Sequence, residues 1–140
     1  MASRSTSRRP AGLALPAKAA LALRIWTRFL FVRTMLPRQP LPAFVSRLGR
    51  ARRRRRELPP AQLARAVHRT LCVRGRRPTC LVASLVLFRL LREQGDPAEI
   101  VIGLPGVAKS KDAHAWVELD GVDVGPPPGR GTHEAMARFG

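Results

Sequence analysis

Two short stretches decide the fold, TCLVASLVLFRLLRE at residues 79–93 and AHAWVELDGVD at residues 113–123. In the first, apolar residues recur at helical spacing, Thr79 stands where a helix N-cap belongs, and Gly95 follows where a helix C-terminal glycine belongs. In the second, an apolar strand runs into Asp120-Gly121, a strong signal for a tight hairpin turn. The sequence therefore predicts a helix followed, after a β-branched run at residues 97–104, by a β-hairpin.

The first half of the chain predicts further helices. Residues 17–35 place Leu21, Ile25 and Phe29 at roughly helical spacing among arginines, which indicates an amphipathic helix. We interpret its apolar stripe as packing on the rest of the protein, the alternative being docking on a membrane surface. A proline-broken linker then turns into a short helix, and residues 61–71 predict another.

Length and composition limit the possible architectures. A chain of 140 residues holds one ordinary domain, here of the α+β class. We divide it into a disordered basic tail at 1–16, a basic helical region with a linker at 17–60, and a packed core at 61–140. With Cys72 and Cys80 as its only cysteines, the chain has neither a disulfide scaffold nor a four-cysteine zinc site.

Positive charge is concentrated in the first half. Residues 1–77 hold 20 Lys or Arg and one acid, whereas residues 78–140 hold 6 basic and 8 acidic residues. Such a basic half can contact nucleic acid, an anionic membrane or an acidic partner. We interpret the five consecutive arginines at 52–56 as a solvated linker or helix face, because no aromatic residues interleave to stack on bases.

No membrane segment is predicted. Lys18, Arg24, Arg28 and Arg33 interrupt the Leu/Ala-rich region, so that no run reaches the roughly 20 apolar residues of a spanning helix. The N-terminus mimics a signal peptide, but Lys18 falls inside its apolar run and no convincing cleavage site follows. We expect a cytoplasmic protein.

Cys80 is the candidate nucleophile. It lies in the first turn of the predicted helix, where unpaired backbone amides and the helix dipole favour a thiolate and can also stabilise an oxyanion. A buried, inert cysteine is an equally good interpretation of the position alone.

His114 favours the catalytic interpretation. It begins the predicted strand, where alternation places it on one face with Trp116 and Glu118. A histidine facing a cysteine at a helix tip can take the thiol proton and return it to a leaving amine. A satisfied core histidine is the alternative. His68, among arginines, and His133, in the Gly-rich tail, are expected to be surface residues.

The two stretches together resemble the transglutaminase-like leader peptidases of lasso-peptide biosynthesis, the B2 proteins. The matching motifs are the Cys-Leu-x-x-Ser helix start at Cys80, the Leu-Leu-Arg helix end, Gly103, and Ala-His-Ala-Trp-Val-Glu followed by Asp-Gly. The resemblance covers residues 61–126. It implies a transglutaminase/papain-like core in which a nucleophile helix packs on a small antiparallel sheet.

The resemblance also implies an activity. Cys80 would be the nucleophile and His114 the general base and acid, cutting the bond between the leader and the core of a lasso precursor peptide. No metal or organic cofactor is implied. The implied partners are the precursor, a separate leader-binding winged-helix protein and a lasso cyclase, and neither nucleic acid nor stable membrane insertion is expected. The alternative is a non-enzymatic module, either a degenerate member of the fold or a basic nucleic-acid binder.

Two positions depart from the family pattern. Ala83 replaces the arginine usual before the serine of the nucleophile helix, and Pro126 stands where the family has its third catalytic acid. We nominate Asp123 as the residue that orients His114. An ideal hairpin register pairs Asp123 with Glu118 on the histidine face, but about 13 Å along the strand from His114, so direct contact needs a bulge or another register. Asp112 is nearer along the chain, at about 7 Å.

If an orienting acid is missing, we expect slow turnover. The cysteine–histidine pair remains, but the imidazole is no longer held in the correct tautomer and orientation. We expect the Pro126→Asp variant to cleave a leader faster than the natural protein does. Leader cleavage timed by mass spectrometry measures this. An unchanged rate would mean that another group already orients His114.

Overall fold

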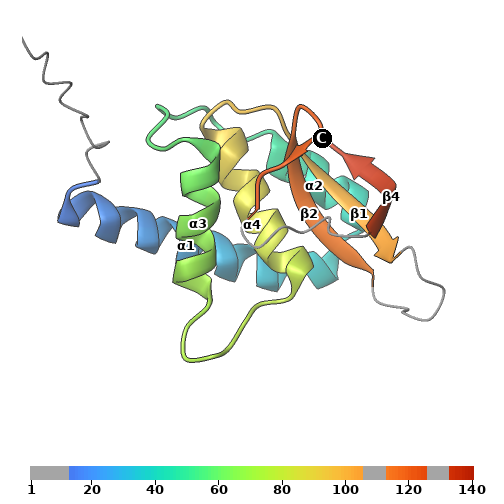
Figure 1. Ribbon diagram of the computed structural model, residues 1–140, viewed down its shortest axis with the longest axis horizontal. Helices are drawn as coiled ribbons and strands as arrows, with labels where there is room; N and C mark the ends of the chain where they lie inside the picture. Colours follow the sequence, from blue (N-terminus) through green and yellow to red (C-terminus); the bar gives the residue numbers. More distant parts are fainter. Residues whose placement is uncertain (1–12, 106–112, 126–132) are drawn as a thin grey trace, which may run out of the picture.

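The computed structural model describes residues 13–105, 113–125 and 133–140. Its helices are α1 (Leu15–Met35), α2 (Leu41–Gly49), α3 (Pro60–Leu71) and α4 (Cys80–Glu93), with a short 3-10 helix η1 (Leu36–Arg38) after α1. The strands are β1 (Ala98–Pro105), β2 (His114–Leu119), β3 (Val122–Asp123) and β4 (His133–Phe139). Helices precede a small antiparallel sheet (Figure 1), which confirms the predicted α+β class.

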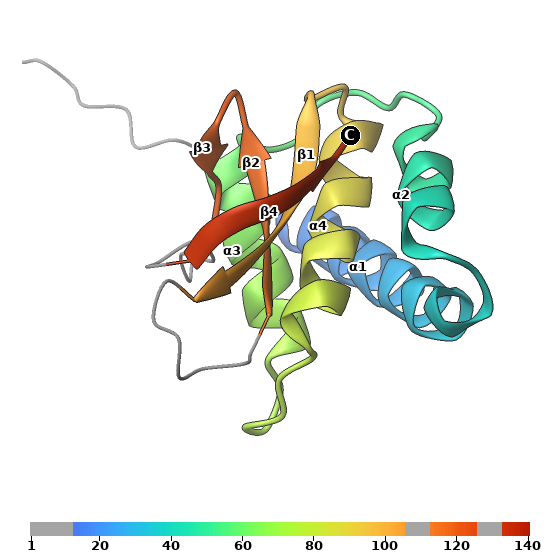
Figure 2. The same ribbon diagram turned by 90° about the vertical axis from the view of Figure 1, so that its right-hand side faces the viewer.

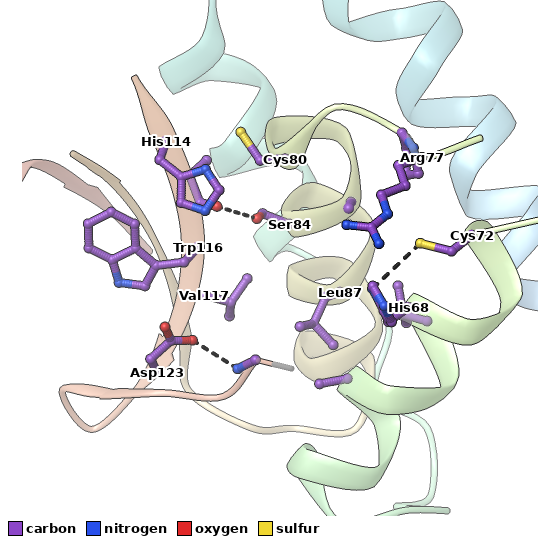
Figure 3. A pocket seen from close by; sticks show the side chains of 16 residues that line it. His68, Cys72, Arg77, Cys80, Ser84, Leu87, His114, Trp116, Val117 and Asp123 are labelled. Atoms are coloured by element: carbon purple, nitrogen blue, oxygen red, sulfur yellow. Dashed lines mark hydrogen bonds between the residues drawn. The ribbon is translucent and has the colours of Figure 1, made fainter. Parts of the chain in front are cut away.

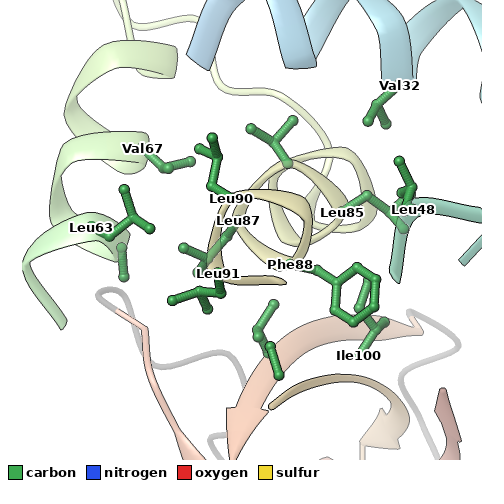
Figure 4. Packing of buried hydrophobic residues seen from close by; sticks show 14 of the residues in the cluster. Val32, Leu48, Leu63, Val67, Leu85, Leu87, Phe88, Leu90, Leu91 and Ile100 are labelled. Carbon is green, nitrogen blue, oxygen red and sulfur yellow. The ribbon is translucent and has the colours of Figure 1, made fainter. Parts of the chain in front are cut away.

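Helix α4 is the central element of the fold. It packs against α1, α2 and α3 and against β1 and β2, and it lies between the sheet and α1 (Figure 2). A view along its axis shows side chains from all of these helices and from the sheet converging on it (Figure 4). From its second turn onward its apolar residues are all buried: Leu85, Val86, Leu87, Phe88, Leu90 and Leu91. A helix that is apolar on all sides is stable only inside a core.

The ends of α4 are as the sequence predicts. The Thr79 hydroxyl accepts a hydrogen bond from the amide of Val82 at 3.4 Å, which makes Thr79 the N-cap. At the other end, Gly95 has a φ of +83°, a left-handed conformation that glycine adopts without strain. These signals are local, and they fix the position of Cys80 as the first residue of the helix.

The sheet has the strand order β3-β2-β1-β4. The turn between β2 and β3 has positive φ at both Asp120 (50°) and Gly121 (78°), as a type I′ turn requires. It sets the predicted register, with Leu119 opposite Val122 and Glu118 opposite Asp123.

Residues 133–139, for which the sequence predicts no helix or strand, form β4 along the free edge of β1. Its pairing with β1 shifts register between Ile102 and Gly103. The segment gave little strand signal, since Ala135 and Ala137 have low β propensity. The side chain of His133 lies outside the described part of the chain.

The hydrophobic core crosses the boundary that we drew at residue 60. Leu21, Ile25 and Val32 of α1 and Phe44 of α2 belong to the same buried cluster as α4 and Ile100 of β1. The apolar stripe of α1 therefore packs on the protein. Within the described residues, no helix is long and apolar enough to cross a membrane.

The arginine run at 52–56 forms a linker without regular secondary structure. Although it precedes α4 in the sequence, it lies in space beside the C-terminal end of that helix. The amide of Arg54 donates to the carbonyl of Glu93 at 2.6 Å, and Arg56 pairs with the buried carboxylate of Asp96. The guanidinium of Arg53 lies over Gly95. Because a helix C-terminus carries partial negative charge, arginines are favourable there.

A buried ion cluster joins α1 to α4. The carboxylate of Glu93, 2% exposed, accepts hydrogen bonds at 2.9 Å from Arg28 of α1 and from Arg89 of α4. Arg89 also donates to the carbonyl of Leu48 at 3.0 Å, near the end of α2. A buried carboxylate is tolerated only with such partners.

We expect Glu93→Gln to lower the free energy of unfolding by about 1–3 kcal/mol, because both arginines lose a charged acceptor. Urea unfolding measures this. The matched control is Glu57→Gln, which breaks the half-exposed pair with Arg24 and should cost less than about 1 kcal/mol. Equal losses in the two variants would show that the Glu93 cluster adds nothing beyond a surface pair.

Candidate active site

A pocket of about 220 Å³ opens between α3, the loop before α4, α4 itself and the β2–β3 hairpin. Its wall contains all three predicted site residues, Cys80, His114 and Asp123 (Figure 3). Segments more than 30 residues apart in the sequence thus meet at one cavity.

Cys80 occupies the N-terminal end of α4, half-buried and carrying a free thiol. In the first turn, the amide of Val82 bonds the Thr79 hydroxyl and the amide of Ala83 bonds the Thr79 carbonyl. The amides of Cys80 and Leu81 precede these hydrogen bonds, at the positive end of the helix dipole. This is a suitable environment for negative charge on sulfur or on an oxyanion beside it.

His114 is the first residue of β2 and lies opposite Gly103 of β1. Figure 3 shows the Cys80 thiol directed from the tip of α4 toward the start of β2, where the imidazole of His114 lies. Next to this histidine, the carbonyl of Ala115 accepts a hydrogen bond at 3.0 Å from the hydroxyl of Ser84, one turn after Cys80. This bond connects α4, with Cys80 at its tip, directly to β2, with His114 at its start.

Asp123 lines the pocket farther along the hairpin. It lies opposite Glu118, the position that the ideal register predicts, and its carboxylate accepts a hydrogen bond from the amide of Gly125 at 2.8 Å. Figure 3 shows Trp116 between His114 and Asp123. The role of Asp123 in orienting His114 therefore stays a prediction. Asp112 and Pro126 lie outside the described residues.

The family model of the transglutaminase-like superfamily matches residues 19–137. The chain belongs to this superfamily. The match begins within α1 and ends within β4, so the superfamily domain includes the basic helical region as well as the α4–sheet core. The chain has no significant match among curated proteins or among solved structures. The superfamily includes cysteine peptidases, and a thiol at a helix tip beside a strand histidine fits that chemistry.

A second group on the pocket wall was not predicted as part of the site. His68, expected at the surface, is half-buried on α3, and its Nδ1 lies 3.6 Å from the Cys72 sulfur. The sequence placed these two residues four apart, at one helical turn, but gave no sign that α3 would face Cys80. Among the described residues, no group of three His, Cys, Asp or Glu side chains could hold a metal ion.

We expect Ser84→Ala to lower the free energy of unfolding by about 1–3 kcal/mol, because the buried Ala115 carbonyl loses its donor. It should also slow any reaction of the Cys80–His114 pair, since α4 and β2 lose a direct connection. Urea unfolding measures the first effect. Thr27→Ala is the control, because that hydroxyl bonds only the carbonyl of Leu23 in its own helix. A Ser84→Ala variant as stable as Thr27→Ala would contradict the proposed connection.

Proposed function

We propose that this protein is a cysteine peptidase that removes the leader from a ribosomally made lasso precursor peptide. The observation that carries the proposal is the presence of Cys80, at the tip of α4, and His114, at the start of β2, on the wall of one pocket. The superfamily membership supports the general chemistry, and the motif resemblance around these two residues supports the substrate.

In the first half of the reaction, the thiol of Cys80 gives its proton to His114 and the sulfur attacks the carbonyl carbon of the scissile peptide bond. The carbonyl oxygen becomes an oxyanion, which the first-turn amides of α4 stabilise. His114 returns the proton to the leaving nitrogen as the C–N bond breaks. The products of this half are the free amine of the core peptide and a thioester between the leader and Cys80.

In the second half, His114 takes a proton from water, and the resulting hydroxide attacks the thioester carbon. The C–S bond breaks, the leader leaves as a carboxylic acid, and the proton returns to the cysteine. The two residues thus complete hydrolysis without a cofactor.

The rest of the pocket is consistent with a peptide substrate. Its floor is apolar, with Ala64 and Val67 from α3, Leu87 from α4 and Val117 from β2. An uncharged side chain next to the scissile bond can bury apolar surface there, which helps to align the carbonyl with the thiol. Arg77 at the rim is available to a carboxylate on the same peptide.

The proposed partners follow from the substrate. A separate winged-helix protein would present the leader, and an ATP-dependent lasso cyclase would consume the freed core, all in the cytoplasm. The exposed basic residues of the first half offer a surface for an acidic partner or for the precursor. A nucleic-acid role for the arginine run has less support, because the side chains of Arg53 and Arg56 already lie against Gly95 and Asp96 after the end of α4.

We expect Cys80→Ala to reduce leader cleavage by about 10³-fold or more, because removing one residue of a catalytic unit costs about as much as removing the whole unit. His114→Ala should cause a loss of similar size. The assay incubates the protein with a lasso precursor peptide and its leader-binding protein and follows leader release by mass spectrometry.

Cys72→Ser is the matched control, a second half-buried thiol on the same pocket wall, and it should retain cleavage. Unchanged cleavage in Cys80→Ala would refute the peptidase proposal. If removal of the arginine run abolished function at the same time, the protein would be a binding module.

A further inference from the structure

The face of the sheet that carries His114 also carries an ordered polar network. The rings of His114 and Trp116 stack with their centroids 6.5 Å apart and their planes inclined by 29°. The indole Nε1 of Trp116 donates a hydrogen bond to the carboxylate of Glu118 at 2.8 Å. His114, Trp116 and Glu118 alternate along β2, so these contacts follow one face of the strand.

Glu118 is an unusual residue for its position. Its side chain is fully buried, and its two carboxylate oxygens bond the Trp116 indole and the guanidinium of Arg138 from β4. This hydrogen bond and the negative charge of Glu118 raise the pKa of Arg138. Burying a carboxylate is unfavourable unless it is paired and hydrogen-bonded, and here both requirements are met.

The Trp116 ring is also confined from β1. Gly103 lies opposite His114, and a Cβ atom on Gly103 would come within 2.6 Å of the Trp116 Cη2 and within 2.5 Å of the Glu134 carbonyl. The missing side chain at Gly103 thus leaves the space that the indole fills. Trp116 is 2% exposed although it lines the pocket.

From this arrangement we propose that Trp116 is a positioning residue for His114, and that Glu118 and Arg138 hold Trp116 in place. A fixed aromatic plane beside the imidazole restricts rotation of the ring and keeps it directed at Cys80. In a catalytic triad, an orienting acid aligns the histidine in the same way. The proposal rests on the Cys80–His114 pair of the proposed function.

The test uses the reaction of Cys80 with iodoacetamide, which needs no peptide substrate. All variants carry Cys72→Ser, so that Cys80 is the only thiol. When His114 is aligned, it accepts the thiol proton and Cys80 reacts near neutral pH; at high pH, where every thiol is ionised, the alignment has no effect. The ratio of rates at about pH 6.5 and about pH 10 therefore reports the pair, independently of overall stability.

We expect Trp116→Phe and Glu118→Met, which remove the indole–carboxylate hydrogen bond from opposite ends, to lower this ratio by about tenfold. Glu118→Gln retains an oxygen acceptor for the indole and should restore most of the ratio. Glu99→Gln is the control, because this half-exposed carboxylate also lies near Arg138, at 3.7 Å, but does not contact the indole. With a precursor peptide, Trp116→Phe should lower kcat and leave KM within about twofold.

His114→Ala separates the two possible failures. If it leaves the ratio unchanged, Cys80 and His114 do not act as a pair, and the proposed function fails. If it lowers the ratio but Trp116→Phe and Glu118→Met do not, the positioning role of Trp116 is wrong while the pair stands. Should Trp116→Phe or Glu118→Met fail to fold, as judged by thermal melting, the other variant decides. Arg138→Gln, which removes the charged partner of the Glu118 carboxylate at a half-exposed position, replaces a variant that is lost and should also lower the ratio.

Discussion

The burial of α4 is the constraint on which the rest of the structure depends. A fourteen-residue helix with apolar residues on all sides must be covered by α1, α2, α3 and the sheet together. Because the covering elements come from both halves of the chain, the basic region folds as part of the domain. The thiol of Cys80 lies at the N-terminal end of this helix, on the wall of a pocket, so the same packing that stabilises the core also sets the position of the candidate nucleophile.

The two faces of the sheet contribute to different parts of the structure, one to the hydrophobic core and the other to the polar network beside the pocket. Val117 and Ile100 belong to the cluster that packs around α4, whereas the Trp116 indole bonds the buried carboxylate of Glu118 on the other face of β2. His114, at the first residue of the strand, lines the same pocket as Cys80 at the tip of α4. Ser84 connects the two layers by its hydrogen bond to the Ala115 carbonyl. A strand that is apolar on one face and polar on the other can therefore serve the core and the site at once.

The excess of positive charge has structural uses that its total does not reveal. Arg28 and Arg89 neutralise the buried Glu93, and the guanidinium groups of Arg53 and Arg56 lie at the C-terminal end of α4, over Gly95 and against Asp96. Other arginines, such as Arg65 and Arg69 of α3, are exposed and available to a partner. Composition alone does not distinguish the arginines that make structural contacts from those that are exposed and available to a partner.

The sequence by itself determined the local features: the start of α4 at Thr79, its end at Gly95, the turn at Asp120-Gly121 and the hairpin register. Each depends on residues close together in the chain, so the signal is complete within one short window. It also identified Cys80 and His114 as candidates. Only the tertiary structure decided that α3 brings His68 and Cys72 to the same pocket, that residues 133–139 add a strand to β1, and that Arg138 thereby reaches Glu118. These are long-range contacts, and no local pattern encodes which distant segment fills the free edge of a strand.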